Sequence, residues 1–341
     1  MSTQSQEPAY VEITRGSLVE SVHPVSISVM DGDGATVLSL GDVSKPVFPR
    51  SAVKAIQALP LIESGAADAL GFGDAELSLS CASHSGEDGH IETARRMLAK
   101  AGLDETVLEC GGHWSSQAWV MRHQTTIWDD TPGPICNNCS GKHSGFVCTA
   151  AHTGIDPTGY IKHDHPVQNA VRDAMEMVTG AAHTEDVRGI DGCSIPTYAI
   201  PLTAMAQGFA RMATGTGLGT QRAQAGKRLL NACMASPFHM AGTNRFCTKL
   251  MSLGESSATD GSLFAKTGAE GVFCGAIPEL GLGIALKCED GTTRAAEAMM
   301  ATVFAHLLPD HDVLQDGLKA LAAPTLKNWN GMEVGTVRAV L

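Results

Sequence analysis

Apolar and polar residues alternate near both ends of the chain, which predicts β-strands there. Residues 11–13 and 25–29 place valine or isoleucine at every second position, the spacing of a strand with one buried face. The sequence Asp31-Gly32-Asp33-Gly34 then indicates a tight turn before another apolar run. Short apolar runs return toward the C-terminal end and predict strands near 263–266, 272–275, 281–287 and 332–340.

The region between these ends carries helical patterns, separated by clusters of Gly, Pro and Thr. They predict helices near 142–152, 166–179, 199–213, 219–235 and 245–253. Outside that region we expect helices near 91–100, 294–308 and 311–321. A short apolar run from Glu76 to Ala82 predicts a further strand.

This order of elements predicts an α/β (α+β) fold. We expect a mixed antiparallel sheet from the two ends of the chain, about 9–60 and 262–341, with a mainly helical region of about 87–260 inserted between them. The whole chain, 1–341, is expected to form a single catalytic unit.

Composition excludes several classes of protein. The 341 residues are 43% hydrophobic and 18% charged, which suits a packed core. The net charge of −12 argues against nucleic acid and anionic membrane surfaces as partners. The first eight residues lack a basic and apolar secretory signal, and no apolar run approaches the ~18 residues of a transmembrane helix. The ten cysteines are therefore expected to be thiols, metal ligands or buried hydrophobic residues, in a cytoplasmic protein.

The chemistry is expected to centre on the stretch 48–57. Pro49 and Ser51 are residues that start helices, and Ser51 and Lys54 then lie three apart on one helix face. A buried lysine favours its neutral form and can activate a neighbouring serine as a nucleophile. Taken alone, the pair also fits a helix cap and a lysine that extends to water.

Two further segments follow in the order found in penicillin-recognising enzymes. Ser83-His84-Ser85 comes where a predicted strand ends, and Lys266-Thr267-Gly268 lies on a predicted strand. Ser83 alone could be structural, because Ser85-x-x-Asp88 resembles a capping box. The first segment lacks the Asn of Ser-Asp-Asn and no deacylating Glu is evident, which indicates a different substrate.

A third segment runs from Cys136 to Gly145. Cys136-x-x-Cys139 could bind a soft metal or act as a redox pair. It is not a phosphate-binding loop, because the first glycine is missing and His143 replaces the Ser or Thr. Lys142 and His143 at a helix N-terminus would suit a carboxylate.

Together these segments resemble the L-asparaginases of the Rhizobium etli type, also called class 3 or the asparaginase II family. The matching pieces, in the family's order, are Phe48-Pro49-Arg50-Ser51-Ala52-Val53-Lys54-x-x-Gln57, Cys81-Ala82-Ser83-His84-Ser85-Gly86-Glu87, Cys139-Ser140-Gly141-Lys142-His143, Asp191-Gly192-Cys193 and Lys266-x-Gly268-Ala269-Glu270-Gly271. The resemblance implies a serine-β-lactamase/glutaminase-like fold and a homodimer. It implies two Ser-Lys tandems, Ser51 with Lys54 and Ser83 with Lys266.

The resemblance also implies a metal site, typically zinc, that is not the source of the nucleophile. Its ligands would be Cys139, Lys142 and Cys247, with Asp191 close by. A lysine ligand must be neutral, so we expect a depressed pKa at Lys142.

The expected activity is hydrolysis of L-asparagine to L-aspartate and ammonia through an acyl-enzyme on Ser51. Arg50 and His143 are candidate cations for the substrate α-carboxylate. Glu270 is a candidate carboxylate partner for the substrate α-ammonium group. Three alternatives stay open: a glutaminase-like amidase, a β-lactam or ester hydrolase, and a non-catalytic metal or thiol sensor. The sensor would be built around Cys136, Cys139 and Cys247.

Overall fold

The structure is a computed structural model that describes residues 3–5, 7–128, 130–256 and 262–341. The chain divides into two compact units. The sheet unit comprises Met1–Ala52, Ile200–Gly217 and Lys249–Leu341, and the helical unit comprises Val53–Ala199 and Leu218–Thr248. Whether they act together as one catalytic unit stays a prediction.

Strands from both ends of the chain build the sheet unit, as the alternation predicts. Nine strands of the described chain share one sheet, in the order β12-β13-β2-β3-β11-β10-β9, with β4 paired to β3 and β1 paired to β4. The pairs are antiparallel except β1 with β4. The strands are β1 (Thr3–Ser5), β2 (Ala9–Arg15), β3 (Leu18–Asp31), β4 (Thr36–Leu40), β9 (Phe264–Thr267), β10 (Val272–Ile277), β11 (Leu282–Cys288), β12 (Thr325–Lys327) and β13 (Glu333–Val340).

Two helices cover opposite faces of this sheet. Helix α9 (Leu202–Thr214) packs so closely on β11 that a Cβ at Gly283 would lie 2.0 Å from the Ala206 carbonyl oxygen. Helix α13 (Thr293–Leu307) packs on β10, where Gly275 faces the ring of Phe304. Gly275 pairs with the residue after Gly283, so the two glycines point to opposite faces. The core therefore lies in two layers, one on each side of the sheet.

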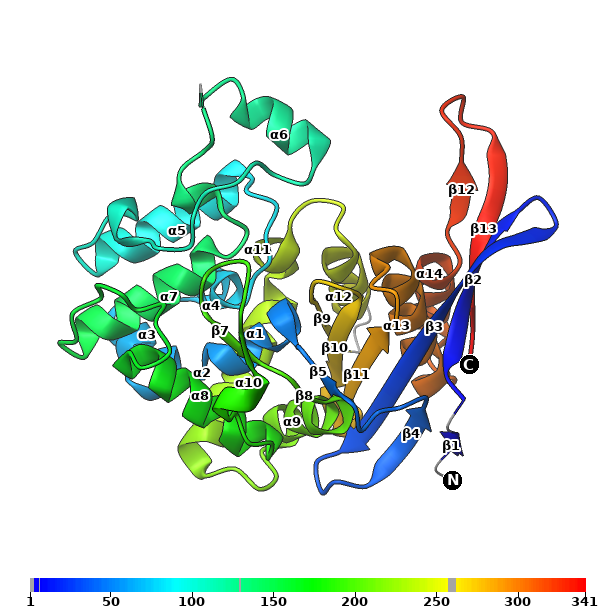
Figure 1. The fold of residues 1–341 in the computed structure, drawn as a ribbon, viewed down its shortest axis with the longest axis horizontal. Coiled ribbons are helices and arrows are strands. Elements are labelled where there is room, and N and C mark those ends of the chain that lie inside the picture. Colours follow the sequence, from blue (N-terminus) through cyan, green and yellow to red (C-terminus); the bar gives the residue numbers. More distant parts are fainter. Residues whose placement is uncertain (1–2, 6, 129, 257–261) are drawn as a thin grey trace. The chain divides into compact units, whose positions relative to one another are not determined.

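The remaining elements of the sheet unit are short or peripheral. The hairpins of β2 with β3 and of β12 with β13 extend together from one end of the sheet (Figure 1). The other elements are β5 (Pro46–Val47), η1 (Arg50–Val53), β8 (Ile200–Pro201), η5 (Pro278–Leu280) and α14 (Asp312–Ala322). Helix α12 (Phe246–Ser256) and the turn η1 both cross the boundary between the two units.

The helical unit packs short helices around one another. Their bounds are α1 (Lys54–Gln57), α2 (Leu59–Glu63), α3 (Ala66–Ala69), α4 (Asp74–Ser80), α5 (Asp88–Lys100), η2 (Glu105–Val107), α6 (Ala118–Gln124), η3 (Pro134–Cys136), α7 (Ser140–His152), α8 (Pro166–Thr179), η4 (Glu185–Val187), α10 (Thr220–Ala235) and α11 (Pro237–Ala241). A hairpin joins β6 (Arg188–Ile190) to β7 (Pro196–Tyr198). No helix of the described chain is both long and apolar enough to cross a bilayer.

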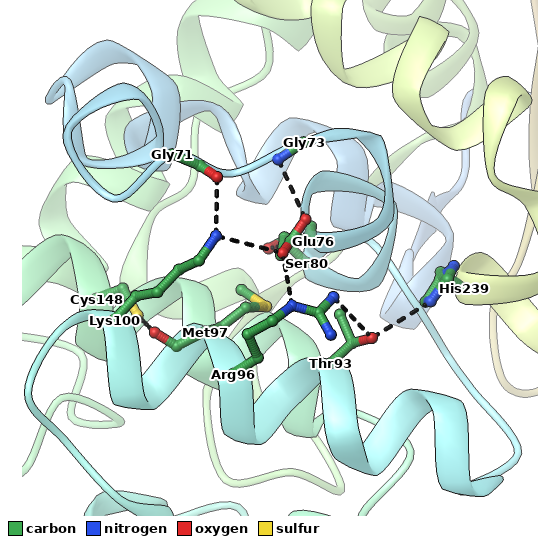
Figure 2. Close-up of polar contacts among 10 residues, drawn as sticks. All are labelled: Gly71, Gly73, Glu76, Ser80, Thr93, Arg96, Met97, Lys100, Cys148 and His239. Atoms are coloured by element: carbon green, nitrogen blue, oxygen red, sulfur yellow. Dashed lines mark hydrogen bonds and ion pairs between the residues drawn. The ribbon is translucent and has the colours of Figure 1, made fainter.

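The predicted strand at 76–82 is wrong, because Asp74–Ser80 forms helix α4. The Glu76 carboxylate accepts the Gly73 N–H at 3.1 Å and so caps the helix start. Arg96 and Lys100 of α5 pair with the same carboxylate, at 3.0 and 3.6 Å (Figure 2). The last five residues of α4 are all buried, so the sequence there shows no helical alternation.

The helix predicted from Ser51 is also interrupted. Residues Arg50–Val53 form a tight 3₁₀ turn, α1 follows for one turn, and α2 starts with Pro60 in its first turn. Proline fits a first turn because its missing N–H would have no helical partner there. The other predicted helices and strands are confirmed within a few residues.

Candidate active site

Ser51 lies in the 3₁₀ turn that follows β5. It is half-buried, and the turn is closed by the Ala52 N–H, which donates to the Pro49 carbonyl at 3.0 Å. The preceding residue, Arg50, adopts φ +50°. A non-glycine residue in this left-handed region is strained, and such strain concentrates at functional sites.

The end of β9 lies against this turn within the sheet unit. A Cβ at Gly268 would come within 2.8 Å of the Pro49 carbonyl oxygen and 3.2 Å of the Ala52 nitrogen. Only glycine permits that approach, which brings Lys266-Thr267-Gly268 alongside the backbone around Ser51. Lys266 is buried and donates from Nζ to the Thr267 carbonyl at 2.7 Å. The sheet unit therefore brings together two of the three predicted motifs.

Lys54 and Ser83 meet in the helical unit. The Lys54 Nζ donates to Ser83 Oγ at 3.1 Å, to Cys139 Sγ at 3.1 Å and to the Ala82 carbonyl at 2.5 Å. Lys54 is fully buried and Ser83 is 7% exposed. An amine that contacts a hydroxyl away from water is an arrangement for moving a proton between them.

The loop that carries Ser83 is held by the segment between α11 and α12. The Ser83 N–H donates to the Met240 carbonyl at 3.1 Å. The Glu87 carboxylate accepts the Thr243 N–H at 2.7 Å and its hydroxyl at 2.6 Å. Between these contacts, Gly242 adopts φ +114°, and a Cβ there would lie 2.4 Å from Glu87 Oε1. Sequence reasoning missed this clamp, although Glu87 stands in one of the matching segments.

His84 connects the same loop to the start of α7. Its Nδ1 accepts the Gly86 N–H at 3.1 Å, so its Nε2–H donates to Ser140 Oγ at 3.0 Å. Burial lowers the pKa of His84 well below its ordinary value. The ring stacks on His90 at 5.0 Å. His84 is therefore a neutral connector between two segments of the helical unit.

A thiol and amine cluster lies at the N-terminus of α7. Lys142 Nζ donates to Cys193 Sγ at 3.1 Å, and Cys193 lies in the turn between β6 and β7. A hydrogen bond from Cys193 lowers the pKa of Cys139 well below that of a free thiol, and it raises the pKa of Cys193, the donor. Cys193 was not predicted as a site residue, although the triplet Asp191-Gly192-Cys193 pointed to it.

The charge of Lys142 in the absence of a metal follows from the groups around it. Burial by itself lowers its pKa, but the nearby Cys193, Cys139 and Asp191 raise it more. The pKa of Lys142 is therefore raised, and the amine is an ammonium ion in this cluster. A metal ion would have to displace that proton.

The surroundings of His143 disfavour a cationic side chain, and its predicted role toward the substrate carboxylate stays a prediction. The side chain is fully buried, and burial together with Lys142 and Lys54 lowers its pKa well below the ordinary value. The imidazole is neutral and can take part only through hydrogen bonds. Arg50, beside Ser51, stays a candidate for the substrate carboxylate. Glu270 lies exposed in the turn between β9 and β10 with φ +58°, and its predicted role stays a prediction.

The family model for L-asparaginase II matches residues 11–339, nearly the whole chain. The chain belongs to the L-asparaginase II family. A search of curated proteins finds no match.

Two solved structures are similar to this family member at low identity. A β-lactamase from Mycobacterium bovis is 12% identical, with 87% of this chain and 92% of that chain covered and a TM-score of 0.37. A structure of Mglu in its glutamate form is 14% identical, with 85% and 61% covered and a TM-score of 0.35. The α/β assignment rests on the observed sheet and helices themselves.

The L-asparaginase II resemblance raises the question of a metal. Among the described residues no group of three or more His, Cys, Asp or Glu is placed to hold one. Cys139, Cys193 and the Lys142 amine do converge, and two sulfurs with one nitrogen suit a soft ion such as zinc. The donor set therefore fits only if Lys142 is included. Cys247 lies buried in the first turn of α12, and its assignment as a ligand stays a prediction.

Proposed function

We propose that this amidohydrolase is an L-asparaginase that converts L-asparagine to L-aspartate and ammonia. The observation that carries the proposal is the buried hydrogen bond between Lys54 and Ser83. Lys54 follows Ser51 by three residues in the sequence. Membership of the L-asparaginase II family over 11–339 supports the reaction class.

In this proposal Ser51 is the nucleophile. Its Oγ attacks the side-chain amide carbon, and Lys54, which must be an uncharged amine for this step, takes the hydroxyl proton directly or through Ser83. The carbon–nitrogen bond then breaks, and the departing amine takes a proton from the same network to leave as ammonia. Water hydrolyses the resulting β-aspartyl ester, which restores Ser51 and releases aspartate.

Backbone N–H groups would hold the oxyanion. The Ser51 N–H is one candidate. On the strand side, the Gly268 N–H already donates to the Val272 carbonyl at 2.7 Å. The next N–H along the chain, that of Ala269, is therefore the better candidate.

Zinc, the homodimer, the cytoplasmic location and the Rhizobium etli type are further parts of the proposal. Cys139, Lys142 and Cys193 would hold the zinc, which when bound supplies positive charge at the sulfur that Lys54 contacts. All ten cysteines are free thiols, which suits a reducing compartment.

The test is the variant Ser51→Ala. Ammonia release from asparagine should fall to background while the unfolding midpoint stays close to that of the parent. The matched control is Ser17→Ala, an exposed serine of the sheet unit, which should leave activity unchanged. Rapid quenching and mass spectrometry should find a β-aspartyl adduct on Ser51 in the parent. Activity within a few-fold of the parent in Ser51→Ala would refute the nucleophile.

Relative kcat/KM for asparagine and glutamine decides between the proposal and a glutaminase-like amidase. The same proton-transfer groups serve both amides, so only the fit of the longer side chain differs. A higher kcat/KM for glutamine would reassign the substrate and leave the chemistry in place.

A further inference from the structure

Tyr160 is a fully buried phenol that no motif singled out. Its hydroxyl oxygen accepts the Glu109 N–H at 2.9 Å and lies 2.6 Å from His143 Nδ1. Its ring meets the His143 ring edge-on, with centroids 5.4 Å apart. Both residues belong to the helical unit.

These two contacts determine where the phenolic hydrogen goes. The Glu109 N–H can only donate, so it occupies an acceptor site of the Tyr160 oxygen. In the described contacts, His143 Nδ1 is then the one acceptor within reach of the Tyr160 O–H. Nδ1 accepts that hydrogen bond, so a neutral His143 carries its own hydrogen on Nε2.

The Nε2–H of His143 has no hydrogen-bond partner among the described residues, although the atom is buried. A buried donor without a partner is costly and uncommon in native proteins. The contacts of Tyr160 with Glu109 and His143 orient this donor, which has no acceptor among the described residues. An acceptor from outside the chain is therefore expected at Nε2.

The neighbours indicate what kind of acceptor this is. His143 directly follows Lys142 in the first turn of α7, and the Lys142 Nζ lies over the Phe146 ring at 5.8 Å. The Phe146 ring is also 5.8 Å from the His143 ring. A fixed donor beside an amine, at a helix N-terminus, suits a carboxylate oxygen better than a neutral carbonyl.

We propose that Tyr160 is a positioning residue that holds His143 in its Nε2–H form, and that this N–H binds a carboxylate oxygen of the amino-acid substrate. The proposal rests on the proposed asparaginase function and adds to it the residue that sets the tautomer. It assigns His143 a neutral donor role in place of the cationic one.

The first test is independent of turnover. Long-range ¹⁵N–¹H NMR of protein labelled on histidine reports which ring nitrogen carries hydrogen, and His143→Gln identifies the His143 signals by their loss. The expected result is Nε2–H for His143. His183 supplies an internal reference of the opposite form, because its Nδ1 lies 2.8 Å from the Ala181 carbonyl and must donate to it. An Nδ1–H or averaged signal at His143 would overturn the proposal.

The second test is Tyr160→Phe, which removes the hydroxyl and keeps the ring. His143 should then populate both tautomers, and KM for asparagine should rise about three- to tenfold with kcat within about twofold. The control is Tyr198→Phe, which alters another buried tyrosine, 4.9 Å from the His183 ring, and should leave KM unchanged. An unchanged KM in Tyr160→Phe would contradict the role in binding.

The third test uses aspartate, the proposed product, as the probe. Aspartate at saturation, verified by calorimetry, should shift the His143 Nε2–H resonance of the parent protein. No shift on verified binding would mean that Nε2 meets a buried water only, and the proposal would fail. If Ser51→Ala retained activity while the tautomer and the shift were as expected, the asparaginase mechanism would fail and the binding role of His143 would stand.

Discussion

The Nζ of Lys54 donates a hydrogen bond to the Oγ of Ser83 at 3.1 Å, and both side chains are buried. The same nitrogen contacts Cys139 Sγ. One amine thus links the first Ser-Lys motif of the chain, the second serine and the thiol cluster. Four predictions follow from these contacts and those around them.

Lys54→Ala should lower kcat for asparagine by about 10²–10⁴-fold, because the proton acceptor is removed. Ser83→Ala should also lower kcat, and the double variant should lose little more than the worse single variant, since the two act as a unit. Steady-state kinetics on all three variants measures this. Lys227→Ala, at an exposed position of the helical unit, is the control. Additive losses would show that Lys54 and Ser83 act separately.

The Glu87–Thr243 clamp should matter for activity beyond its effect on folding. Gly242→Ala forces a Cβ against the Glu87 carboxylate at a backbone angle that suits glycine. We expect a loss of about 2 kcal/mol in the free energy of unfolding, and at least a tenfold loss of kcat, because the Ser83 loop shifts.

Gly154→Ala is the matched control for that change. Gly154 also has a positive φ, +70°, but a Cβ there meets nothing within 4 Å. It should cost about 1 kcal/mol of stability and leave kcat unchanged. Equal effects of both variants on kcat would mean that the clamp does not position the loop.

Stability should fall on mild acidification. Burial lowers the pKa of His90 to about 4, so the unfolded chain takes up a proton there before the folded protein does. The neutral His90 side chain contributes up to about 3 kcal/mol to the free energy of unfolding above about pH 6.5. This contribution is lost as the pH falls toward about 4.

Urea unfolding between pH 7 and pH 4 measures this contribution. His90→Phe keeps a ring to stack on Phe238, whose centroid is 4.5 Å away, but has no titrating group. Its stability should therefore depend less steeply on pH than that of the parent. His152→Phe, on the surface, should leave the slope as it is. An unchanged slope in His90→Phe would show that another group governs the acid transition.

Metal content distinguishes Cys193 from Cys247. Protein purified with zinc should retain about one ion. The variant Cys193→Ser should lose it, because the Sγ of Cys193 contacts the Nζ of Lys142, another proposed ligand. Cys247→Ser should retain the ion, and so should Cys148→Ser, whose Sγ donates to the Met97 carbonyl. Elemental analysis of the three variants gives the answer. Loss of zinc in Cys247→Ser and not in Cys193→Ser would favour Cys139, Lys142 and Cys247 as the ligands.

Features that depend on local pattern could be predicted from the sequence. Strand alternation at 11–13 and 25–29 predicted the sheet from both ends, because a half-buried strand imposes a period of two. The spacing of Ser51 and Lys54 indicated a nucleophile with a base. The Lys266-Thr267-Gly268 motif was recognised from its residues and their order, and its glycine permits the close backbone approach.

Features that depend on contacts between distant segments could not be predicted in this way. Helix α4 is buried along most of its length, so no periodic pattern distinguished it from a strand. The charge of His143 depends on its burial and on Lys54, which lies far from it in sequence. The contact between Lys142 and Cys193 joins residues that are 51 apart in the sequence. Sequence spacing specifies neighbours along one helix or strand, whereas pKa values and ligand sets depend on which segments the fold packs together.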